Sequence, residues 1–396
     1  MQTDRPIARR QILARSLYIH WPFCLAKCPY CDFNSHVRDR TDIAAWEAAL
    51  LADMRHERSE IETKQPLVSV FFGGGTPSLM PPALVASLLD EAEKLWGFDD
   101  SIEITLEGNP SSIEAANFSD LASAGVNRVS LGVQSLHDDV LKFLGRLHGA
   151  QEALNALQIA QKHFERVSFD LIYARPGQSP EDWEAELSRA LKLGTSHLSL
   201  YQLTIEPTTR FATDVRRGVF SPLEDDPAAD LFALTRHMTG AAGLPAYEIS
   251  NHAAPGQESR HNLTYWRYQD YHGIGPGAHG RRNGVATIRH KKPENYLAAV
   301  AEQGHGISEA RTLGAREQAS EAMLMGLRLA EGVDLVALSN RFGVPVAKLV
   351  DGGKLGLYSG LGLVSKQGQR LVVTDAGMPL LDALLGELVP SELVST

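Results

Sequence analysis

The stretch Leu17-Tyr-Ile-His-Trp-Pro-Phe-Cys-Leu-Ala-Lys-Cys-Pro-Tyr-Cys31 contains every cysteine of the 396-residue chain, namely Cys24, Cys28 and Cys31. An apolar and aromatic run leads directly into the first of them, as at the end of a buried strand. Three thiolates can hold three irons of a four-iron cluster and leave the fourth iron without a protein ligand. A small molecule could bind at that open position.

A zinc ion is the other metal that these thiolates could hold. Tetrahedral zinc needs a fourth ligand, and His20, Asp32 or His36 could supply it. The C-x3-C-x2-C spacing instead resembles the signature of the radical S-adenosylmethionine (SAM) enzymes. The resemblance implies a [4Fe-4S] cluster whose open iron is chelated by the amine and carboxylate of SAM. A zinc-stabilised adaptor remains the non-enzymatic alternative.

Length and composition indicate a soluble globular protein of two or three domains, counting about 150 residues for each. Hydrophobic residues make up 43% of the chain, and no run approaches the roughly 20 apolar residues of a membrane-spanning helix. The net charge of −10 disfavours nonspecific nucleic-acid binding, which depends on Lys and Arg neutralising phosphates.

The expected compartment is the cytoplasm. Residues 1–15 carry four arginines but no apolar core, which excludes a secretory signal and leaves a transit peptide as the alternative. Three clustered cysteines do not form a disulfide framework, and exposed iron–sulfur chemistry needs reducing conditions.

Short β-branched segments alternate with longer amphipathic ones through the first half of the chain. The predicted strands are 16–20, 67–72, 102–106, 128–132, 167–172 and 197–201. The predicted helices are 41–61, 82–95, 114–124, 138–144, 151–163 and 180–193. Repeated strand–helix units predict an α/β fold with a parallel sheet, curled into a partial (β/α)6 barrel like an incomplete TIM barrel. The strand ends would then converge on one mouth.

Three domains are expected: a barrel core over 1–210, an extension over 211–310, and a C-terminal domain over 311–396. In the extension, 208–243 reads as helical with a break at Pro222–Pro227. The order of helices and strands after Arg316 predicts a winged-helix-like domain. Its seven Lys/Arg against nine Asp/Glu give no basic face for DNA, so a structural or partner-docking role is favoured.

Polar residues and glycines follow several of these strands. Phe72-Gly-Gly-Gly-Thr-Pro77 would let a ligand approach the backbone closely. A carboxylate suits ribose hydroxyls, an amide both donates and accepts, and a guanidinium pairs with a carboxylate. Glu107, Gln134 and Arg146 supply these groups near strand ends.

These motifs resemble those of the oxygen-independent coproporphyrinogen III oxidase family, from about residue 15 to about residue 280, with a related C-terminal domain beyond. The resemblance implies that one set of side chains and glycines contacts SAM. The set is Tyr18, Tyr30, Gly74, Gly75, Thr76, Glu107, Gln134, Arg146 and Asp170.

One position separates this chain from the oxidases. Their pattern has a fourth cysteine two residues after the third, where this chain has Phe33, which can neither ligate iron nor relay a proton. Asp32-Phe33-Asn34 resembles the sister group, the HemW heme chaperones.

A second motif, Arg260-His-Asn-Leu-Thr-Tyr-Trp266, is similar to the H-N-x-x-Y-W heme-associated motif of that group. His261 could coordinate heme iron, while Tyr265 and Trp266 could stack against the macrocycle. The alternative for His261 is a hydrogen-bonded packing residue, and His252, His272 and His279 are alternative iron ligands.

The resemblance implies a heme chaperone that uses a [4Fe-4S] cluster and SAM, binds heme and passes it to an acceptor apo-hemoprotein. Radical SAM decarboxylation of porphyrinogen propionates is the enzymatic alternative. For a heme chaperone, we expect SAM cleavage without oxidase activity. A flavodoxin- or ferredoxin-like electron donor is expected. The sequence leaves open a membrane-associated acceptor and a homodimer.

Overall fold

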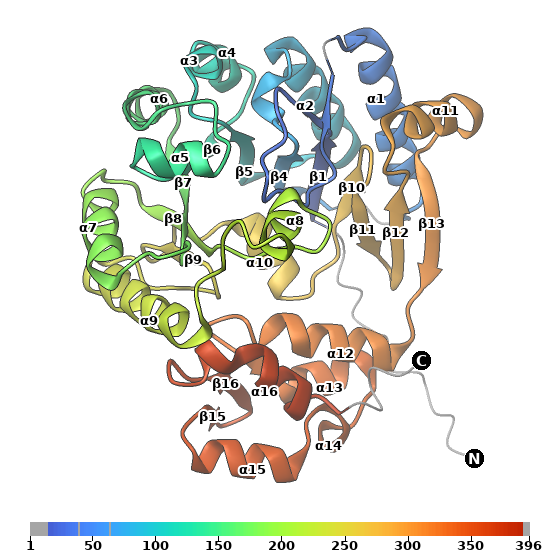
Figure 1. Cartoon of the computed structure of the whole chain (residues 1–396). Coiled ribbons are helices and arrows are strands. Elements are labelled where there is room, and N and C mark those ends of the chain that lie inside the picture. Colours follow the sequence, from blue (N-terminus) through green and yellow to red (C-terminus); the bar gives the residue numbers. More distant parts are fainter. Residues whose placement is uncertain (1–14, 39, 63–64, 391–396) are drawn as a thin grey trace, which may run out of the picture.

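A predominantly parallel eight-stranded sheet lies at the centre of the computed structural model, which describes residues 15–38, 40–62 and 65–390 (Figure 1). Its strand order is β10-β1-β4-β5-β6-β7-β8-β9. The six strands predicted from the sequence form its middle. They are β1 (Ser16–Trp21), β4 (Leu67–Gly74), β5 (Phe98–Gly108), β6 (Arg128–Gln134), β7 (Arg166–Tyr173) and β8 (His197–Gln202).

Helices alternate with these strands and cover the outer face of the sheet. They are α1 (Ile43–Ser59), α2 (Pro82–Trp96), α3 (Ser112–Ala115), α4 (Phe118–Ser123), α5 (Asp138–Phe143), α6 (Ala150–His163) and α7 (Pro180–Leu191). α7 starts with a capping box, in which Ser179 and Asp182 satisfy each other's backbone amides. The α/β fold with a partial barrel is confirmed, although the helix predicted over 114–124 is two short helices.

The extension after β8 adds a strand to each edge of the sheet, which the sequence did not predict. β9 (Asn251–Ala253) pairs antiparallel with β8, and β10 (His272–Ile274) pairs parallel with β1. Both strands have only three residues, too few to show a period. Helix α10 (Arg260–Trp266) lies between them in the chain.

The remaining elements of the extension pack beside the barrel (Figure 1). α8 (Arg210–Arg216) and α9 (Asp225–Ala241) are separated at 217–224, so the break predicted at Pro222–Pro227 extends into the first turn of α9. A small antiparallel sheet and one helix follow, comprising β11 (His279–Arg282), β12 (Val285–Arg289), α11 (Pro293–Gln303) and β13 (Ile307–Thr312). Two short strands, β2 (Phe23–Cys24) and β3 (His36–Val37), bracket the cysteine loop, and a 3-10 turn, η1 (Pro77–Leu79), follows the glycines.

A smaller C-terminal domain has its own hydrophobic core (Figure 1). Its three-stranded sheet has the order β14-β16-β15. Its elements are α12 (Ala315–Gly326), β14 (Val333–Asp334), α13 (Leu335–Phe342), α14 (Val346–Leu349), α15 (Gly352–Gly360), β15 (Val364–Gln367), β16 (Arg370–Val373), η2 (Met378–Leu380) and α16 (Leu381–Leu388). The sequence missed α15, because glycine is a poor helix former and this helix contains four.

The described residues contain no helix that is both long and apolar enough to cross a lipid bilayer. The N-terminal segment 1–14, on which most of the leader and transit-peptide interpretation depends, lies outside the described residues.

A fully buried ionic cluster ties the extension to the barrel. Asp53 and Glu57 of α1 face Arg289 of β12, with Arg289 Nη2 2.7 Å from the Glu57 carboxylate. Arg282 and His272 contact the same carboxylate at 2.8 and 3.2 Å. Burial alone would raise the pKa of Glu57, but these neighbours lower it well below its usual range. The cluster therefore keeps its charges and fixes the extension on α1.

We expect Glu57→Gln to lower the free energy of unfolding by about 3 kcal/mol, because it leaves buried guanidinium groups without their counter-charge. Chemical denaturation of wild type and variant would measure the change. Glu60→Gln is the matched control. Glu60 caps the end of the same helix and pairs with Arg282 at 3.3 Å, but it is 43% exposed, so its effect should stay below about 1 kcal/mol. Equal stability of wild type and Glu57→Gln would contradict the assignment.

Candidate functional site

The cysteine loop lies at the end of β1, and the structure gives two of its thiols hydrogen-bond donors. Thr76 Oγ1 donates to Cys24 Sγ at 3.4 Å, and Arg146 Nη1 lies 3.3 Å from Cys28 Sγ. The Cys31 amide donates to the Cys28 carbonyl at 3.2 Å. Burial raises the pKa of the Cys24 and Cys31 thiols, so they ionise less readily until a metal binds.

The three thiols are partly exposed, so they are accessible to an incoming cluster. Among the described residues, no three His, Cys, Asp or Glu side chains converge closely enough to hold a single metal ion.

A cavity of about 390 Å³ opens next to the thiols. All three cysteines line it, as do eight of the nine residues predicted to contact SAM. The eight are Tyr30, Gly74, Gly75, Thr76, Glu107, Gln134, Arg146 and Asp170. We call it the nucleotide cavity. Residues from β4, β5, β6 and β7 meet here because parallel strands end at the same edge of the sheet.

Two partly buried carboxyl groups line the nucleotide cavity. Burial, followed by repulsion from Asp170, raises the pKa of Glu107 to about 8. Burial also raises the pKa of Asp170 to about 6, although hydrogen bonds from Ser199 and Ser130 oppose this. Glu107 accepts a hydrogen bond from the Gly74 amide at 3.3 Å. An apolar ligand would not explain two such carboxyls, whereas hydroxyl donors and a cationic sulfonium would favour their ionised form.

The wall around Gln134 is strained and incompletely hydrogen-bonded. Gln134 has a positive φ of 68°, which costs a non-glycine residue about 1–3 kcal/mol. Its Oε1 atom and the Nε atom of Arg146 are buried without partners among the described residues. Unsatisfied polar atoms of this kind are what a polar ligand would satisfy.

Sequence reasoning missed two residues of this wall. Arg146 Nη2 donates to the Gly132 carbonyl at 2.9 Å and to Asn109 Oδ1. A Cβ atom at Gly132 would lie 2.9 Å from Nε2 at the end of the Gln134 side chain, so a larger residue there would displace this side-chain amide. Asn109 stands in the Glu107–Pro110 strand end and could have been included on that ground.

A second cavity of about 610 Å³ adjoins the first and shares Phe33, Gly74 and Glu107 with it. We call it the outer cavity. Tyr18, the ninth predicted SAM residue, lines this one instead, as do Tyr265, Tyr271, His279 and Lys291. Its volume falls within the range of about 300–1,000 Å³ typical of small-molecule sites.

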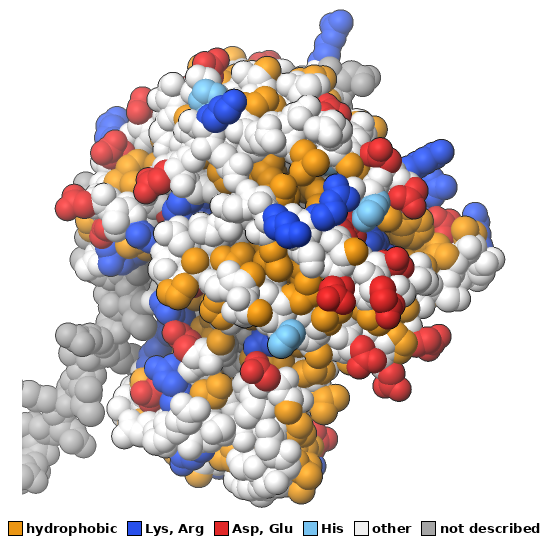
Figure 2. All heavy atoms as spheres, turned by 90° about the vertical axis from the view of Figure 1, so that its left-hand side faces the viewer, with side chains coloured by type: hydrophobic (Ala, Val, Ile, Leu, Met, Phe, Trp, Pro, Cys, Tyr) orange, Lys and Arg blue, Asp and Glu red, His pale blue; other side chains and the backbone are white. Residues whose placement is uncertain are grey.

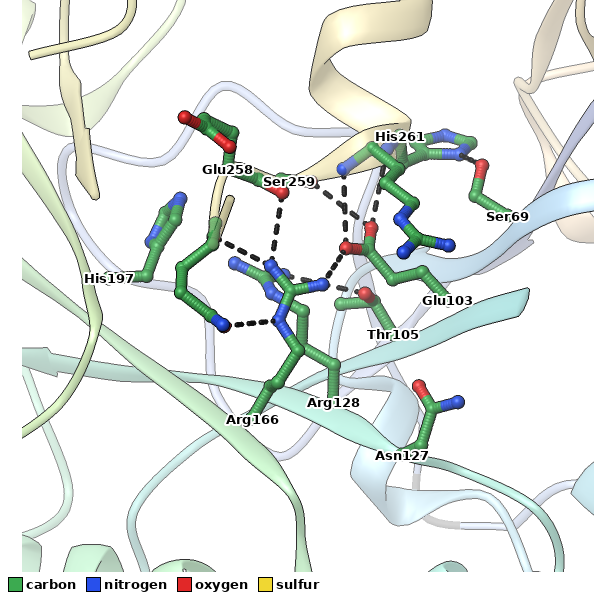
Figure 3. A network of polar contacts seen from close by, with 12 residues as sticks. Ser69, Glu103, Thr105, Asn127, Arg128, Arg166, His197, Glu258, Ser259 and His261 are labelled. Carbon is green, nitrogen blue, oxygen red and sulfur yellow. Dashed lines mark hydrogen bonds and ion pairs between the residues drawn. The ribbon is translucent and has the colours of Figure 1, made fainter. Parts of the chain in front are cut away.

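His261 lies in the protein core and lines neither cavity. Figure 3 shows Glu103 pointing toward the start of α10, where its carboxylate accepts from the Arg260 and His261 amides at 3.2 and 3.3 Å. Arg166 donates to the same carboxylate at 2.6 Å. The H-N-x-x-Y-W helix is thus anchored inside the barrel by a buried carboxylate.

Both ring nitrogens of His261 are engaged. Ser69 donates its hydroxyl proton to Ser16, so at 3.0 Å it accepts from His261 Nδ1. The other nitrogen, Nε2, therefore accepts from the Tyr265 hydroxyl at 2.8 Å. Burial lowers the pKa of His261 to about 3, which keeps the ring neutral. Coordination of iron by His261 would require Tyr265 to release this nitrogen.

The other members of the predicted heme set are dispersed. Tyr265 lines the outer cavity, whereas Trp266 lines neither cavity. His252 is buried against Thr239 and His272 against Glu57, at 2.9 and 3.2 Å. His279 alone of the three alternative ligands is exposed on a cavity wall.

Comparison with known proteins places this arrangement in a family. Residues 18–190 match the radical SAM superfamily, and residues 313–380 match the HemN C-terminal domain. The "Heme chaperone HemW" of Haemophilus influenzae is 40% identical over 80% of this chain and 83% of its own length. The HemW of Mycobacterium tuberculosis H37Rv is 35% identical over 94% of both chains. The chain belongs to the HemW family of radical SAM proteins.

A eukaryotic protein and a solved structure are also similar to this chain. Zebrafish "Radical S-adenosyl methionine domain-containing protein 1, mitochondrial" is 38% identical over 80% of this chain and 73% of its own. Escherichia coli coproporphyrinogen III oxidase HemN superposes with a TM-score of 0.79 at 23% identity, covering 96% of this chain and 91% of that one. This likeness shows the shared fold. The radical SAM family uses a [4Fe-4S] cluster and SAM, and its HemW members bind heme.

We expect SAM affinity to rise between pH 6 and pH 8, by at most about tenfold per pH unit. Glu107 is protonated below its pKa of about 8, and SAM favours the ionised carboxylate, so binding releases a proton in this range. Isothermal titration at several pH values would measure it.

Glu107→Gln should flatten this pH profile, and the difference from wild type carries the test because the amine of SAM also titrates near pH 8. Glu93→Gln, on the exposed side of α2, is the matched control. Identical profiles for wild type and Glu107→Gln would show that Glu107 does not sense the ligand.

Proposed function

We propose that this protein is a heme chaperone that receives heme and transfers it to an acceptor apo-hemoprotein in the cytoplasm. Cys24, Cys28 and Cys31 would hold a [4Fe-4S] cluster, and the nucleotide cavity would hold SAM. The observation that carries the proposal is Phe33, which replaces the fourth cysteine of the oxidase pattern and is 60% exposed between the two cavities. An apolar ring there offers a contact for a macrocycle and no proton for decarboxylation.

The chain's own residues supply the binding and orientation. Arg146 would pair with the SAM carboxylate, and Glu107 and Gln134 would take the ribose hydroxyls. Gly74 brings a backbone amide to the same place, and its positive φ of 116° explains why glycine stands there. When bound, the cluster would supply the electron that cleaves the carbon–sulfur bond of SAM.

The outer cavity is the proposed heme site. Lys27 and Lys291 on its wall can pair with the two propionates of heme, while Phe33, Tyr265 and Tyr271 offer ring faces and edges. His279 makes no side-chain hydrogen bond among the described residues. Burial lowers the pKa of His279, and the positive charge of Lys291 lowers it further. A neutral imidazole with a free nitrogen is the form that ligates iron. We therefore assign iron coordination to His279. The role that we assign to His261 is to position Tyr265 through their hydrogen bond.

The two candidate activities differ in a direct assay. Anaerobically reconstituted protein is expected to take up about one heme per chain and to leave coproporphyrinogen unchanged in the presence of SAM and reductant. Absorbance titration would follow heme, and chromatography would follow the porphyrinogen. Turnover of coproporphyrinogen without stable heme binding would replace the proposal by the oxidase, and zinc in place of iron and sulfide would replace both by the adaptor.

His279→Ala should weaken heme binding at least tenfold and shift its Soret band, because the iron loses its protein ligand. The His279 side chain is exposed, so the fold should persist. His290→Ala is the matched control, since His290 follows β12 and lines neither cavity.

The companion variant His261→Phe tests the second half of the assignment. It is expected to keep the Soret position while lowering the heme affinity, because only the support of Tyr265 is lost. A Soret shift in His261→Phe together with an unchanged spectrum in His279→Ala would return the iron to His261.

A further inference from the structure

A third hollow lies beside the cysteine loop, and neither SAM nor heme accounts for it. It has a volume of about 710 Å³, and Cys28 and Cys31 are part of its wall. None of the nine residues predicted to contact SAM lines it. We call it the basic groove. A partner could approach two of the three thiols through it without displacing a ligand from the nucleotide cavity.

The basic groove is positively charged on a chain whose net charge is −10. Its charged lining residues are Lys27, Lys142, Arg210 and Asp214. Asp214 is partly neutralised by Arg210, 3.4 Å away on α8. Lys27 and Lys142 are exposed and have no ion-pair partner among the described residues. Lys27 also lines the proposed heme site, so Lys142 is the cation next to the cysteine loop that belongs to the groove alone.

The floor of the basic groove is aromatic and fixed. Phe143, Phe211 and Phe220 form a triangle with ring centroids 4.9 to 5.3 Å apart. The Phe211 amide donates to the Pro29 carbonyl at 3.0 Å, which joins α8 to the cysteine loop itself. Val219 at the rim is 67% exposed. Figure 2 shows a face on which hydrophobic side chains gather across the middle, with Lys and Arg among them and Asp and Glu toward one side.

We propose that the basic groove is the docking surface for a small acidic electron-carrier protein. This inference rests on the proposed function, because it assumes a cluster on the three cysteines. One electron would leave the reduced carrier, which is oxidised, and enter the cluster, which is reduced, with no bond formed or broken. A compact apolar floor with a cationic rim suits a brief electron-transfer encounter, which buries less than about 1,200 Å² and is steered by charge.

The acceptor hemoprotein is the other macromolecule that must dock, and it would dock at a different surface from the basic groove. It has to reach the outer cavity, which shares only Lys27 with the basic groove. A test that leaves Lys27 intact and alters Lys142 and Arg210 therefore separates the two partners.

The test uses the cluster-loaded protein and a reduced flavodoxin as the probe. In stopped-flow measurements, Lys142→Glu/Arg210→Glu should slow cluster reduction at least tenfold at low salt, and the deficit should shrink at high salt as charges are screened. The Kd of oxidised flavodoxin, measured by titration, should rise in parallel. Lys162→Glu/Lys192→Glu makes the same charge change at exposed sites at the ends of α6 and α7, away from the cysteine loop, and should match wild type.

Reduction by dithionite distinguishes a failure of the proposed function from a failure of the docking surface. All variants should be reduced normally by dithionite, and a wild-type protein without a reducible cluster would refute the proposed function itself. An unchanged rate and Kd with flavodoxin in Lys142→Glu/Arg210→Glu would overturn the docking surface alone. Slower heme transfer with normal flavodoxin reduction would assign the groove to the acceptor protein instead.

Discussion

Parallel pairing of six strands is the constraint on which the rest of the structure depends. The register aligns Trp21 with Gly74 and Phe72 with Leu106, so successive strands end at one edge of the sheet. The cysteine loop, the glycines and the polar strand ends are thereby collected in one place, although more than 140 residues separate Cys24 from Asp170. A one-residue slip of any strand would send its side chains to the opposite face.

Bringing these groups together is energetically unfavourable, and the rest of the barrel offsets this free energy. Glu107 and Asp170 are partly buried near each other, Gln134 occupies a strained backbone conformation, and buried polar atoms lack partners among the described residues. Each feature is unfavourable without a ligand. Buried strands such as β6, which is buried along almost its whole length, and the ionic cluster of Asp53, Glu57 and Arg289 hold the site in this state.

The H-N-x-x-Y-W helix shows how one motif can serve two purposes. Glu103 accepts from the amides at the start of this helix inside the barrel, and both ring nitrogens of His261 are hydrogen-bonded, one to Ser69 and one to Tyr265. Only Tyr265 reaches a cavity. A pattern of histidine and aromatics is equally typical of a ligand site and of a packed core, and the two are distinguished by where the helix lies.

The sequence by itself determined the alternation of parallel strands and helices and the cysteine triad, because each depends on local period or spacing. The eight residues of the nucleotide cavity were indicated by the family resemblance of the strand-end motifs. The sequence could not determine that β9 and β10 complete the sheet, that Tyr18 faces the outer cavity, or that His261 is enclosed. Edge strands of three residues are too short to show a hydrophobic period. Helix α15 forms although its four glycines have a low helix propensity. These features depend on contacts between residues far apart in the chain, such as Ser69 with His261 and Leu17 with His272, and only the folded structure brings such residues together.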